Sequence, residues 1–161
     1  VVLLICGGYQ LFGQYYQTLE GHKIPGLGIL DFYTVAGSKR LVGNIIVQTE
    51  EPLSDFYPEL KTLVGFENHS GRTYLGSGVN ALGRVLTGFG NNGKDGSEGV
   101  RHMNVFGTYL HGPVLPKNPH LADALLSRAL KRRGQESRLF PLDDALEMMT
   151  HQSIVRRFGT K

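Results

Sequence analysis

The chain has 161 residues, enough for one domain or part of one, and its 40% hydrophobic and 19% charged residues indicate a soluble globular protein. No apolar run approaches the ~20 residues of a membrane-spanning helix, which excludes a transmembrane protein. The single cysteine excludes a disulfide framework and a cysteine-rich zinc site and fits a cytoplasmic location, while a net charge of +3 is too small to indicate a nucleic-acid partner.

The chain opens with five consecutive apolar residues, Val1 to Ile5, a pattern typical of a β-strand buried on both faces. Such a strand needs neighbours on both sides. We therefore expect residues 1–161 to be the C-terminal portion of a single domain that begins before Val1. A tight turn at 6–8 comes next, and apolar residues at helical spacing over 9–19 predict a helix after it.

The next part of the chain has the alternation and turn residues of β-structure. We expect a loop over 21–28 and then two strands, over 29–35 and 41–49, joined by a hairpin turn at 36–39. The polar segment 50–62 contains two prolines and predicts a surface insertion.

Strand-like segments continue in the second half. Further strands are predicted at 63–66 and within 79–89, followed by a loop rich in glycine and asparagine over 88–99. The apolar segment 100–110 predicts one or two short strands that meet at Phe106-Gly107.

Two helices are predicted near the C-terminus. Residues 121–130 place their leucines on one face, and residues 143–158 form the second helical segment. The expected capping and stop residues are Asn118, Pro119, Gly134 and one of Asp143 and Asp144. The whole pattern predicts an α/β fold.

Cys6 occupies the turn between the first strand and the first helix, which is the layout of a nucleophile elbow. We expect glycine at positions 7 and 8 because neighbouring backbone approaches closely there and leaves no room for a side chain. The positive end of the helix is expected to lower the pKa of the thiol, and the N–H of Gly7 to donate to an oxyanion. A buried cysteine at a strand end is the structural alternative, but the flanking glycines, strand and helix favour a nucleophile.

A cysteine nucleophile needs a group that shuttles protons, and His111 is the best placed of the six histidines. It ends an apolar run and precedes Gly112-Pro113, so we expect it at a strand end that opens onto a loop. His69 lies at a polar strand end and also fits the site, and His102 fits either a site or a surface. Polar surroundings predict a solvated surface position for His22, His120 and His151.

Further motifs occur in a fixed order along nearly the whole chain. They are Cys6-Gly7-Gly8-Tyr9-Gln10 and the segments 26–33, 65–69, 71–73, 88–92 and 107–113. This ordered set resembles the class I glutamine amidotransferases, and within them the cobyric-acid-synthase-like group and the glutaminase subunits of lipid II isoglutaminyl synthases. In that class a glutamine four residues after the nucleophile touches the substrate, and Gln10 holds that position.

The resemblance implies a flavodoxin-like α/β sheet flanked by helices, and hydrolysis of L-glutamine through a cysteinyl thioester. Cys6 would attack the side-chain amide carbon, and His111 would protonate the departing ammonia and then activate water. In that subfamily the ammonia passes to a subunit similar to the Mur ligases, which uses ATP to amidate the D-glutamate α-carboxyl of lipid II in peptidoglycan synthesis. ATP and any metal would belong to that partner, so we expect no cofactor on this chain.

The sequence departs from the class in two ways. Most class I enzymes carry a glutamate two residues after the histidine, where this chain has Pro113. His111 is therefore expected to be oriented by another group or to act in a dyad with Cys6. In the family the second oxyanion donor precedes the nucleophile strand, so we expect residues 1–161 alone to show little activity.

The resemblance also indicates substrate contacts. Arg40 holds the position of an arginine implicated in glutamine binding, and a guanidinium suits the α-carboxylate through a bidentate contact. Gln10 is expected to contact the substrate from the first helical turn. Arg72 is at least as well explained by structural support, and Glu67 and His69 are expected in the pocket wall.

Two alternatives remain open from the sequence. One is an amidating domain for cobyrinic or cobyric acid, although the Phe32-Tyr33 context favours the cell-wall subunit. The other is a non-catalytic interaction domain, for which the missing glutamate argues. Against it stands the joint presence of Cys6, Gln10, Arg40 and His111.

Overall fold

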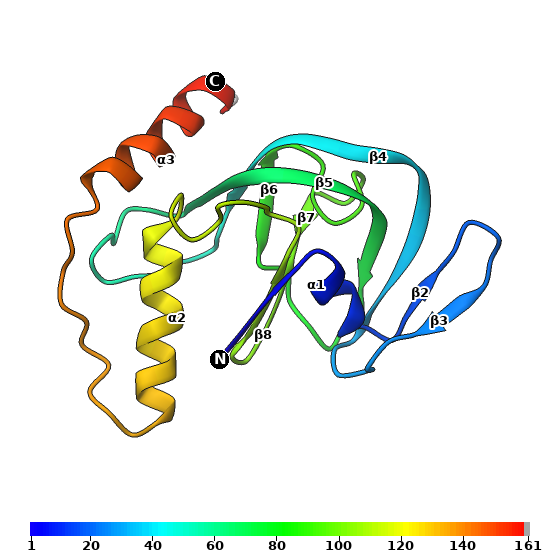
Figure 1. Cartoon of the computed structure of the whole chain (residues 1–161), viewed down its shortest axis with the longest axis horizontal. Helices are drawn as coiled ribbons and strands as arrows, with labels where there is room; N and C mark the ends of the chain where they lie inside the picture. The colour runs from blue at the N-terminus through cyan, green and yellow to red at the C-terminus, as the bar shows by residue number, and fades with distance from the viewer. Residues whose placement is uncertain (160–161) are drawn as a thin grey trace.

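Two β-sheets with helices beside them form the fold, and the predicted α/β class is confirmed. The computed structural model describes residues 1–159. In Figure 1 the long strands β4 and β5 arch over the molecule, with the β2–β3 hairpin projecting on one side and α2 and α3 on the other. None of the three helices in residues 1–159 has the length and apolar character of a membrane span.

The smaller sheet has the order β1–β9–β8 and contains the parallel pair on which the site depends. Strand β1 (Val2–Ile5) runs parallel to β9 (Val105–Thr108), with Ile5 opposite Thr108. Strand β8 (Val100–His102) pairs with β9 in the antiparallel sense. The prediction that the two strands meet at Phe106-Gly107 is wrong, because both residues lie inside β9.

The first strand is present as predicted, but its burial on both faces is not. Among residues 1–159 its only strand neighbour is β9, so β1 lies at a sheet edge. Leu4 is buried, whereas Val2 is 38% exposed. Residues 1–159 supply a strand neighbour on one side of β1 only, so they do not test the expectation of neighbours on both sides.

The larger sheet has the order β3–β2–β4–β6–β7, and β5 also pairs with β4. Its strands are β2 (Tyr15–Gln17), β3 (Lys23–Pro25), β4 (Phe32–Gln48), β5 (Thr62–Leu75), β6 (Gly83–Thr87) and β7 (Ser97–Glu98). The predicted loop over 21–28 therefore contains a short strand.

Strand β4 is continuous, which corrects the predicted hairpin at 36–39. The chain does not turn there because β5 pairs with β4 on both sides of this segment. Ala36 lies opposite Gly71, and after an irregularity in the register Leu41 lies opposite His69. The strand predicted over 63–66 is correspondingly much longer, since β5 follows β4 over most of its length.

Helix α1 (Gly7–Leu11) is also much shorter than the helix predicted over 9–19. A side chain on Gly13 would collide with the ring of Phe32, and the N–H of Gln14 donates to the Phe32 carbonyl at 2.8 Å. The residues after it then form β2 and pair with β4. The helical spacing was genuine, but pairing with a distant strand ends the helix near Phe12.

Both C-terminal helices are present, as α2 (Pro119–Arg132) and α3 (Ala145–Phe158). Asn118 and Asp144 hold the N-cap positions, and Gly134 adopts a positive φ of 72° after α2. The Asn118 side chain does not cap its own helix. It accepts the N–H of Val64 at 2.8 Å and donates to the Val64 carbonyl at 2.8 Å, which joins α2 to β5.

His120 and His151 are both fully buried, so the prediction that they are solvated is wrong. One ring nitrogen of His151 faces Thr62 Oγ1 at 2.9 Å and the other faces the Lys117 carbonyl at 2.9 Å. His120 Nε2 lies 2.9 Å from the Thr62 carbonyl. These bonds join both helices to the start of β5 and satisfy both ring nitrogens of His151 and Nε2 of His120, whereas Nδ1 of His120 is buried without a hydrogen-bond partner among residues 1–159.

Two apolar clusters make up the core. The first lies around α1 and β1 and contains Leu4, Tyr9, Leu30, Phe32, Val79, Val100 and Tyr109. The second lies between the larger sheet and α2 and contains Ile45, Val47, Leu63, Leu82, Phe106, Leu110 and Leu121. Residues 106–110 contribute to both clusters, so the segment that leads to His111 is anchored in the core.

We predict that acid weakens the packing of α2 and α3. Burial, and then the charge of His151, lower the pKa of His120 from its ordinary 6.5 to about 4, and burial also lowers the pKa of His151. At these two histidines the unfolded chain therefore binds more protons than the folded one below pH 6.5. Their contribution to stability should be full above that pH, and the part that His120 contributes should fall by about 2 kcal/mol at pH 5.

The measurement is urea unfolding at pH 7.5 and pH 5.0 of the wild type and of His120→Gln, whose amide can reach the Thr62 carbonyl but does not titrate. The wild type should exceed His120→Gln in free energy of unfolding by about 2 kcal/mol less at pH 5.0 than at pH 7.5. Glu98, a buried carboxyl whose pKa is raised to about 7, changes stability in the opposite sense, but it is common to both proteins and cancels. An advantage that does not change with pH would contradict the prediction.

Candidate active site

Cys6 lies on the turn between β1 and α1, in the predicted order of strand, turn and helix. Its backbone has φ 51° and ψ −108°, a conformation that residues with a Cβ rarely adopt. The Cys6 N–H donates to the Thr108 carbonyl at 3.0 Å, and its own carbonyl accepts the N–H of Gln10 at 3.0 Å. Backbone strain held in place by such bonds is typical of nucleophile elbows.

The thiol of Cys6 is half-buried, and burial raises its pKa above the ordinary value. A hydrogen bond from the Gly7 N–H and the positive charge of Arg40 act in the opposite direction but do not outweigh burial. The prediction of a lowered pKa is therefore wrong for the free site. Helix α1 has only five residues, which limits the dipole expected to stabilise a thiolate.

The space above Gly7 and Gly8 is open. Both residues are exposed, and a Cβ on either would meet nothing within 4 Å. The prediction that closely approaching backbone requires glycine here is not met within residues 1–159. The two glycines leave room beside the sulfur instead.

His111 lies at the same edge of the smaller sheet as Cys6. Cys6 directly follows Ile5 at the end of β1, and His111 comes three residues after Thr108, which pairs with Ile5 at the end of the parallel strand β9. The His111 N–H donates to the Phe66 carbonyl at 2.8 Å, and Nδ1 lies 3.2 Å from the same oxygen. A main-chain carbonyl of β5 thus contacts the nitrogen that a carboxylate would orient in most class I enzymes.

Arg40 is exposed and is held by a single neighbour on β5. Its Nε donates to Asn68 Oδ1 at 2.8 Å, and its Nη2 donates to the Asn68 carbonyl at 2.9 Å. The charge of Arg40 acts on the Cys6 thiol, so the structure brings these two predicted site residues together. With one edge of the guanidinium fixed on Asn68, Nη1 has no hydrogen-bond partner among residues 1–159.

Arg72 supports the irregular part of β4 that carries Arg40. Its Nη2 donates to the Lys39 carbonyl at 2.7 Å and its Nη1 to the Ser70 carbonyl at 2.9 Å. A Cβ on Gly37 would lie 2.8 Å from the guanidinium carbon, so glycine allows this close approach. These bonds give Arg72 the structural role that the sequence favoured at least as much as a substrate contact.

Gln10 points inward from α1 and donates through Nε2 to the hydroxyl of Tyr109 at 3.0 Å. It is half-buried and does not face solvent freely. Tyr109 lies two residues before His111, and the charge of Cys6 acts on its hydroxyl. Gln10, Cys6 and the segment leading to His111 are therefore neighbours.

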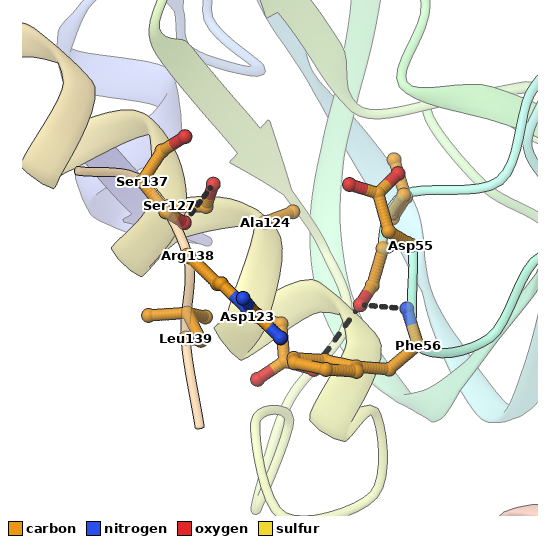
Figure 2. A pocket seen from close by; sticks show the side chains of 10 residues that line it. Asp55, Phe56, Asp123, Ala124, Ser127, Ser137, Arg138 and Leu139 are labelled. Carbon is orange, nitrogen blue, oxygen red and sulfur yellow. Dashed lines mark hydrogen bonds between the residues drawn. The ribbon is translucent and has the colours of Figure 1, made fainter. Parts of the chain in front are cut away.

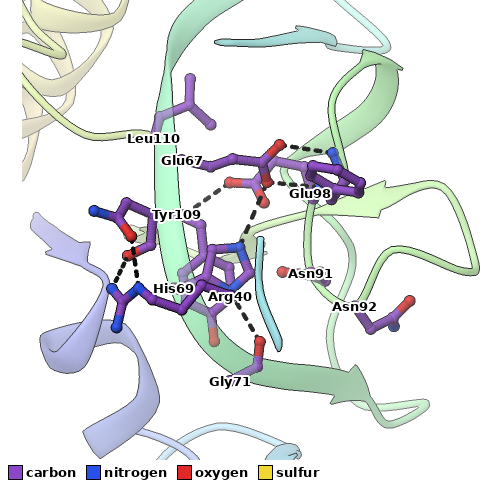
Figure 3. Close-up of polar contacts among 12 residues, drawn as sticks. Arg40, Glu67, His69, Gly71, Asn91, Asn92, Glu98, Tyr109 and Leu110 are labelled. Carbon is purple, nitrogen blue, oxygen red and sulfur yellow. Dashed lines mark hydrogen bonds and ion pairs between the residues drawn. The ribbon is translucent and has the colours of Figure 1, made fainter. Parts of the chain in front are cut away.

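A buried polar network lies behind these residues (Figure 3). Glu67 accepts the N–H groups of Phe89 at 2.7 Å and Gly90 at 3.0 Å, and it lies 3.4 Å from His69 Nε2. The His69 ring stacks on Tyr109 with centroids 3.6 Å apart. Glu67 and His69 are fully or nearly fully buried, so within residues 1–159 they lie beneath the site surface rather than in its wall.

Glu98 belongs to the same network and was missed by the sequence analysis. It is fully buried, and its Oε1 accepts the Thr108 hydroxyl and the Tyr109 N–H. Burial raises its pKa to about 7, and the nearby Glu67 adds to that effect. It lies in β7, within the segment that the sequence predicted as a glycine-rich loop, and that composition carried no signal of burial because such loops are mostly solvated.

A separate cavity is lined by none of the four predicted site residues (Figure 2). The segment 53–56, helix α2 and residues 137–139 line it, and Ser54 donates to Asp123 there at 3.2 Å. Residues 1–159 contain no group of three or more histidine, cysteine, aspartate or glutamate side chains placed to share a metal ion.

Residues 1–119 match the CobB/CobQ-like glutamine amidotransferase domain, which is most of the chain. The chain belongs to this family. It is 44% identical over 155 residues to the Staphylococcus aureus (strain N315) protein named lipid II isoglutaminyl synthase (glutamine-hydrolyzing) subunit GatD, with 96% of this chain and 60% of that protein covered.

The subunit of the same name from Streptococcus pneumoniae is also 44% identical, with 91% of this chain and 54% of that protein covered. A probable cobyric acid synthase from Methanopyrus kandleri is 38% identical, with 70% of this chain and 23% of that protein covered. The chain therefore spans little more than half the length of its curated GatD relatives.

The amidotransferase domain places a thiol, an imidazole, a guanidinium and a carboxamide around one sheet edge. The thiol can attack a carbonyl carbon, and the imidazole can carry protons. The guanidinium and carboxamide can bind the carboxylate and ammonium groups of an amino acid. The sequence indicated all four, namely Cys6, His111, Arg40 and Gln10.

We predict that Arg40→Ala weakens glutamine binding about ten- to hundredfold, the range for a lost hydrogen bond to a charged group. Arg40→Lys should recover only part of the loss, because an ammonium lacks the planar fork. Isothermal titration in a Cys6→Ala background measures the affinity. Lys39→Ala removes the same charge from the next residue and should leave it nearly unchanged. Equal effects of the two alanine variants would show a general charge effect instead.

Proposed function

We propose that this chain carries the catalytic centre of a glutaminase, which hydrolyses L-glutamine through a thioester on Cys6 and supplies ammonia to a synthetase partner. The parallel pairing of β1 with β9 is the main support for this proposal. It brings His111 to the same sheet edge as Cys6, whose backbone is strained. The two GatD relatives, which are named as glutamine-hydrolyzing subunits, support it.

The raised pKa of Cys6 requires a base. At neutral pH the thiol keeps its proton, so a neighbouring group must remove it when glutamine binds. If His111 donates through Nδ1 to the Phe66 carbonyl, its Nε2 carries a lone pair and can accept that proton. The Gly7 N–H and the charge of Arg40 then stabilise the thiolate that forms.

In the first chemical step the sulfur adds to the side-chain amide carbon of glutamine. His111 returns the proton to the amide nitrogen, the C–N bond breaks, and ammonia leaves behind a γ-glutamyl thioester on Cys6. In the second step His111 takes a proton from water, the hydroxide attacks the thioester, and glutamate departs as the thiol is reprotonated. The Gly7 N–H is our candidate donor to the oxyanion of both steps.

We further propose that the ammonia is used by a Mur-ligase-like partner in the cytoplasm. That partner would spend ATP to activate the α-carboxyl of D-glutamate in lipid II, and the product would be D-isoglutamine for peptidoglycan. The two relatives named as subunits of lipid II isoglutaminyl synthase support this pathway over corrinoid amidation, because they are more similar to the chain, and over more of their length, than the cobyric acid synthase.

We predict that Cys6→Ala abolishes ammonia release from glutamine, and that His111→Ala lowers kcat at least ~10²-fold, the low end for acid–base catalysis. The assay is glutamate and ammonia formation by the whole protein with its partner. His22→Ala changes an exposed histidine and is the control. His69→Ala is a poor comparison, since it would open a cavity beneath Tyr109. Substantial turnover by Cys6→Ala would end the thioester mechanism.

The synthetic role is tested with glutamine labelled with ¹⁵N at the side-chain amide. The protein, the Mur-ligase-like subunit, ATP and lipid II are incubated together, and the lipid II is analysed by mass spectrometry. We expect one labelled nitrogen at the D-glutamate α-carboxyl, and none with Cys6→Ala. A label that enters a corrinoid acid while lipid II stays unlabelled would identify the domain as a corrinoid amidating one.

A further inference from the structure

Tyr109 connects the Gln10 side chain to the buried part of the molecule. The Gln10 amide reaches the Tyr109 hydroxyl at 3.0 Å, although the two residues are 99 positions apart. The missing side chain of Gly71 makes this possible, because a Cβ there would collide with Gln10 Nε2. Three separate elements, α1, β5 and the end of β9, therefore shape the place where the carboxamide lies.

The tyrosine is itself fixed from several sides. Its ring stacks on His69 at 3.6 Å and packs edge-on against Tyr9 at 5.2 Å, and its N–H donates to Glu98 at 2.8 Å. Its hydroxyl lies 2.7 Å from Thr73 Oγ1, which in turn lies 2.9 Å from Thr34 Oγ1. All these partners are buried, so Tyr109 has little freedom to move.

The hydrogen bond between Gln10 and Tyr109 fixes which atom of the Gln10 amide is free. Burial raises the pKa of Tyr109 to about 12, so its hydroxyl keeps its proton at neutral pH, and Thr73 Oγ1 lies within hydrogen-bond distance of it at 2.7 Å. The tyrosine oxygen then accepts from Gln10 Nε2, and the amide oxygen of Gln10 is left to accept a further hydrogen bond. An α-ammonium group of an amino acid is the donor that suits this oxygen, with Arg40 nearby for the α-carboxylate.

We infer that Tyr109 is a positioning residue that holds Gln10 so that its amide oxygen faces the α-ammonium group of glutamine. This inference rests on the proposed glutaminase function. Tyr109 does not touch the substrate and takes no part in the proton transfers. Its removal should therefore change substrate binding while the chemistry at Cys6 and His111 continues.

The test is steady-state glutaminase kinetics of the whole protein with its partner, for the wild type and Tyr109→Phe, which keeps the ring and its stacking. A lost neutral hydrogen bond predicts a rise in KM of about three- to tenfold with kcat within about twofold. Tyr74→Phe alters a tyrosine on β5, stacked on Tyr33, and should leave both constants unchanged.

A double-mutant cycle distinguishes this role from general support of the fold. If Tyr109 acts through Gln10, the change Tyr109→Phe should raise KM no further once Gln10 is alanine. Effects that multiply, or a fall in kcat alone, would overturn the inference. Gly71→Ala offers a second route, because the added methyl would displace the Gln10 amide and would also crowd the Thr34 methyl at 2.8 Å and the Tyr109 hydroxyl at 3.1 Å, so it breaks the same hydrogen bond. It should reproduce the rise in KM, and an unchanged KM in a folded Gly71→Ala protein would also overturn the inference.

The two proposals fail in different ways. Absence of glutamine hydrolysis by the wild-type protein with its partner would reject the glutaminase function itself. Wild-type hydrolysis together with an unchanged KM in Tyr109→Phe would reject only the positioning role.

Discussion

The parallel pairing of β1 with β9 is the constraint on which the site depends. Parallel strands bring their carboxyl ends to the same edge, so the register of Ile5 with Thr108 decides that Cys6 and the segment 109–111 are neighbours. The Cys6 N–H extends this ladder by one bond to the Thr108 carbonyl. The unusual backbone of Cys6 is held at one end by that bond and at the other by α1.

Strand β4 supplies Arg40 to the site, and β5 supplies the residue that holds its side chain. Their register irregularity lies between Ala36 and Leu41, and Arg40 is within it. A regular ladder would alternate side chains strictly between the two faces, whereas an irregularity re-aims them. Arg72 holds this shape through main-chain carbonyls, and Asn68 then fixes the guanidinium of Arg40.

Buried polar groups hold the end of β9 and the loop at Phe89 and Gly90 next to the site. Glu98 holds the end of β9 through Thr108 and Tyr109, while Glu67 holds the loop at Phe89 and Gly90 and faces His69. Burying two carboxyls is costly unless their oxygens are bonded, and the cost appears in the raised pKa of Glu98. The same bonds leave the segment from Thr108 to His111 little conformational freedom.

The sequence alone determined the order of the elements near the nucleophile, both C-terminal helices and the family, because strand, turn and capping signals are local and the motifs are contiguous. It also indicated Cys6, Gln10, Arg40 and His111 as site residues. The tertiary structure decided what depends on distant partners. Pairing with β5 keeps β4 continuous through 36–39, Phe32 ends α1 early, and the start of β5 buries His120 and His151. Burial also reversed the expected direction of the Cys6 pKa, since desolvation depends on atoms that no local pattern specifies.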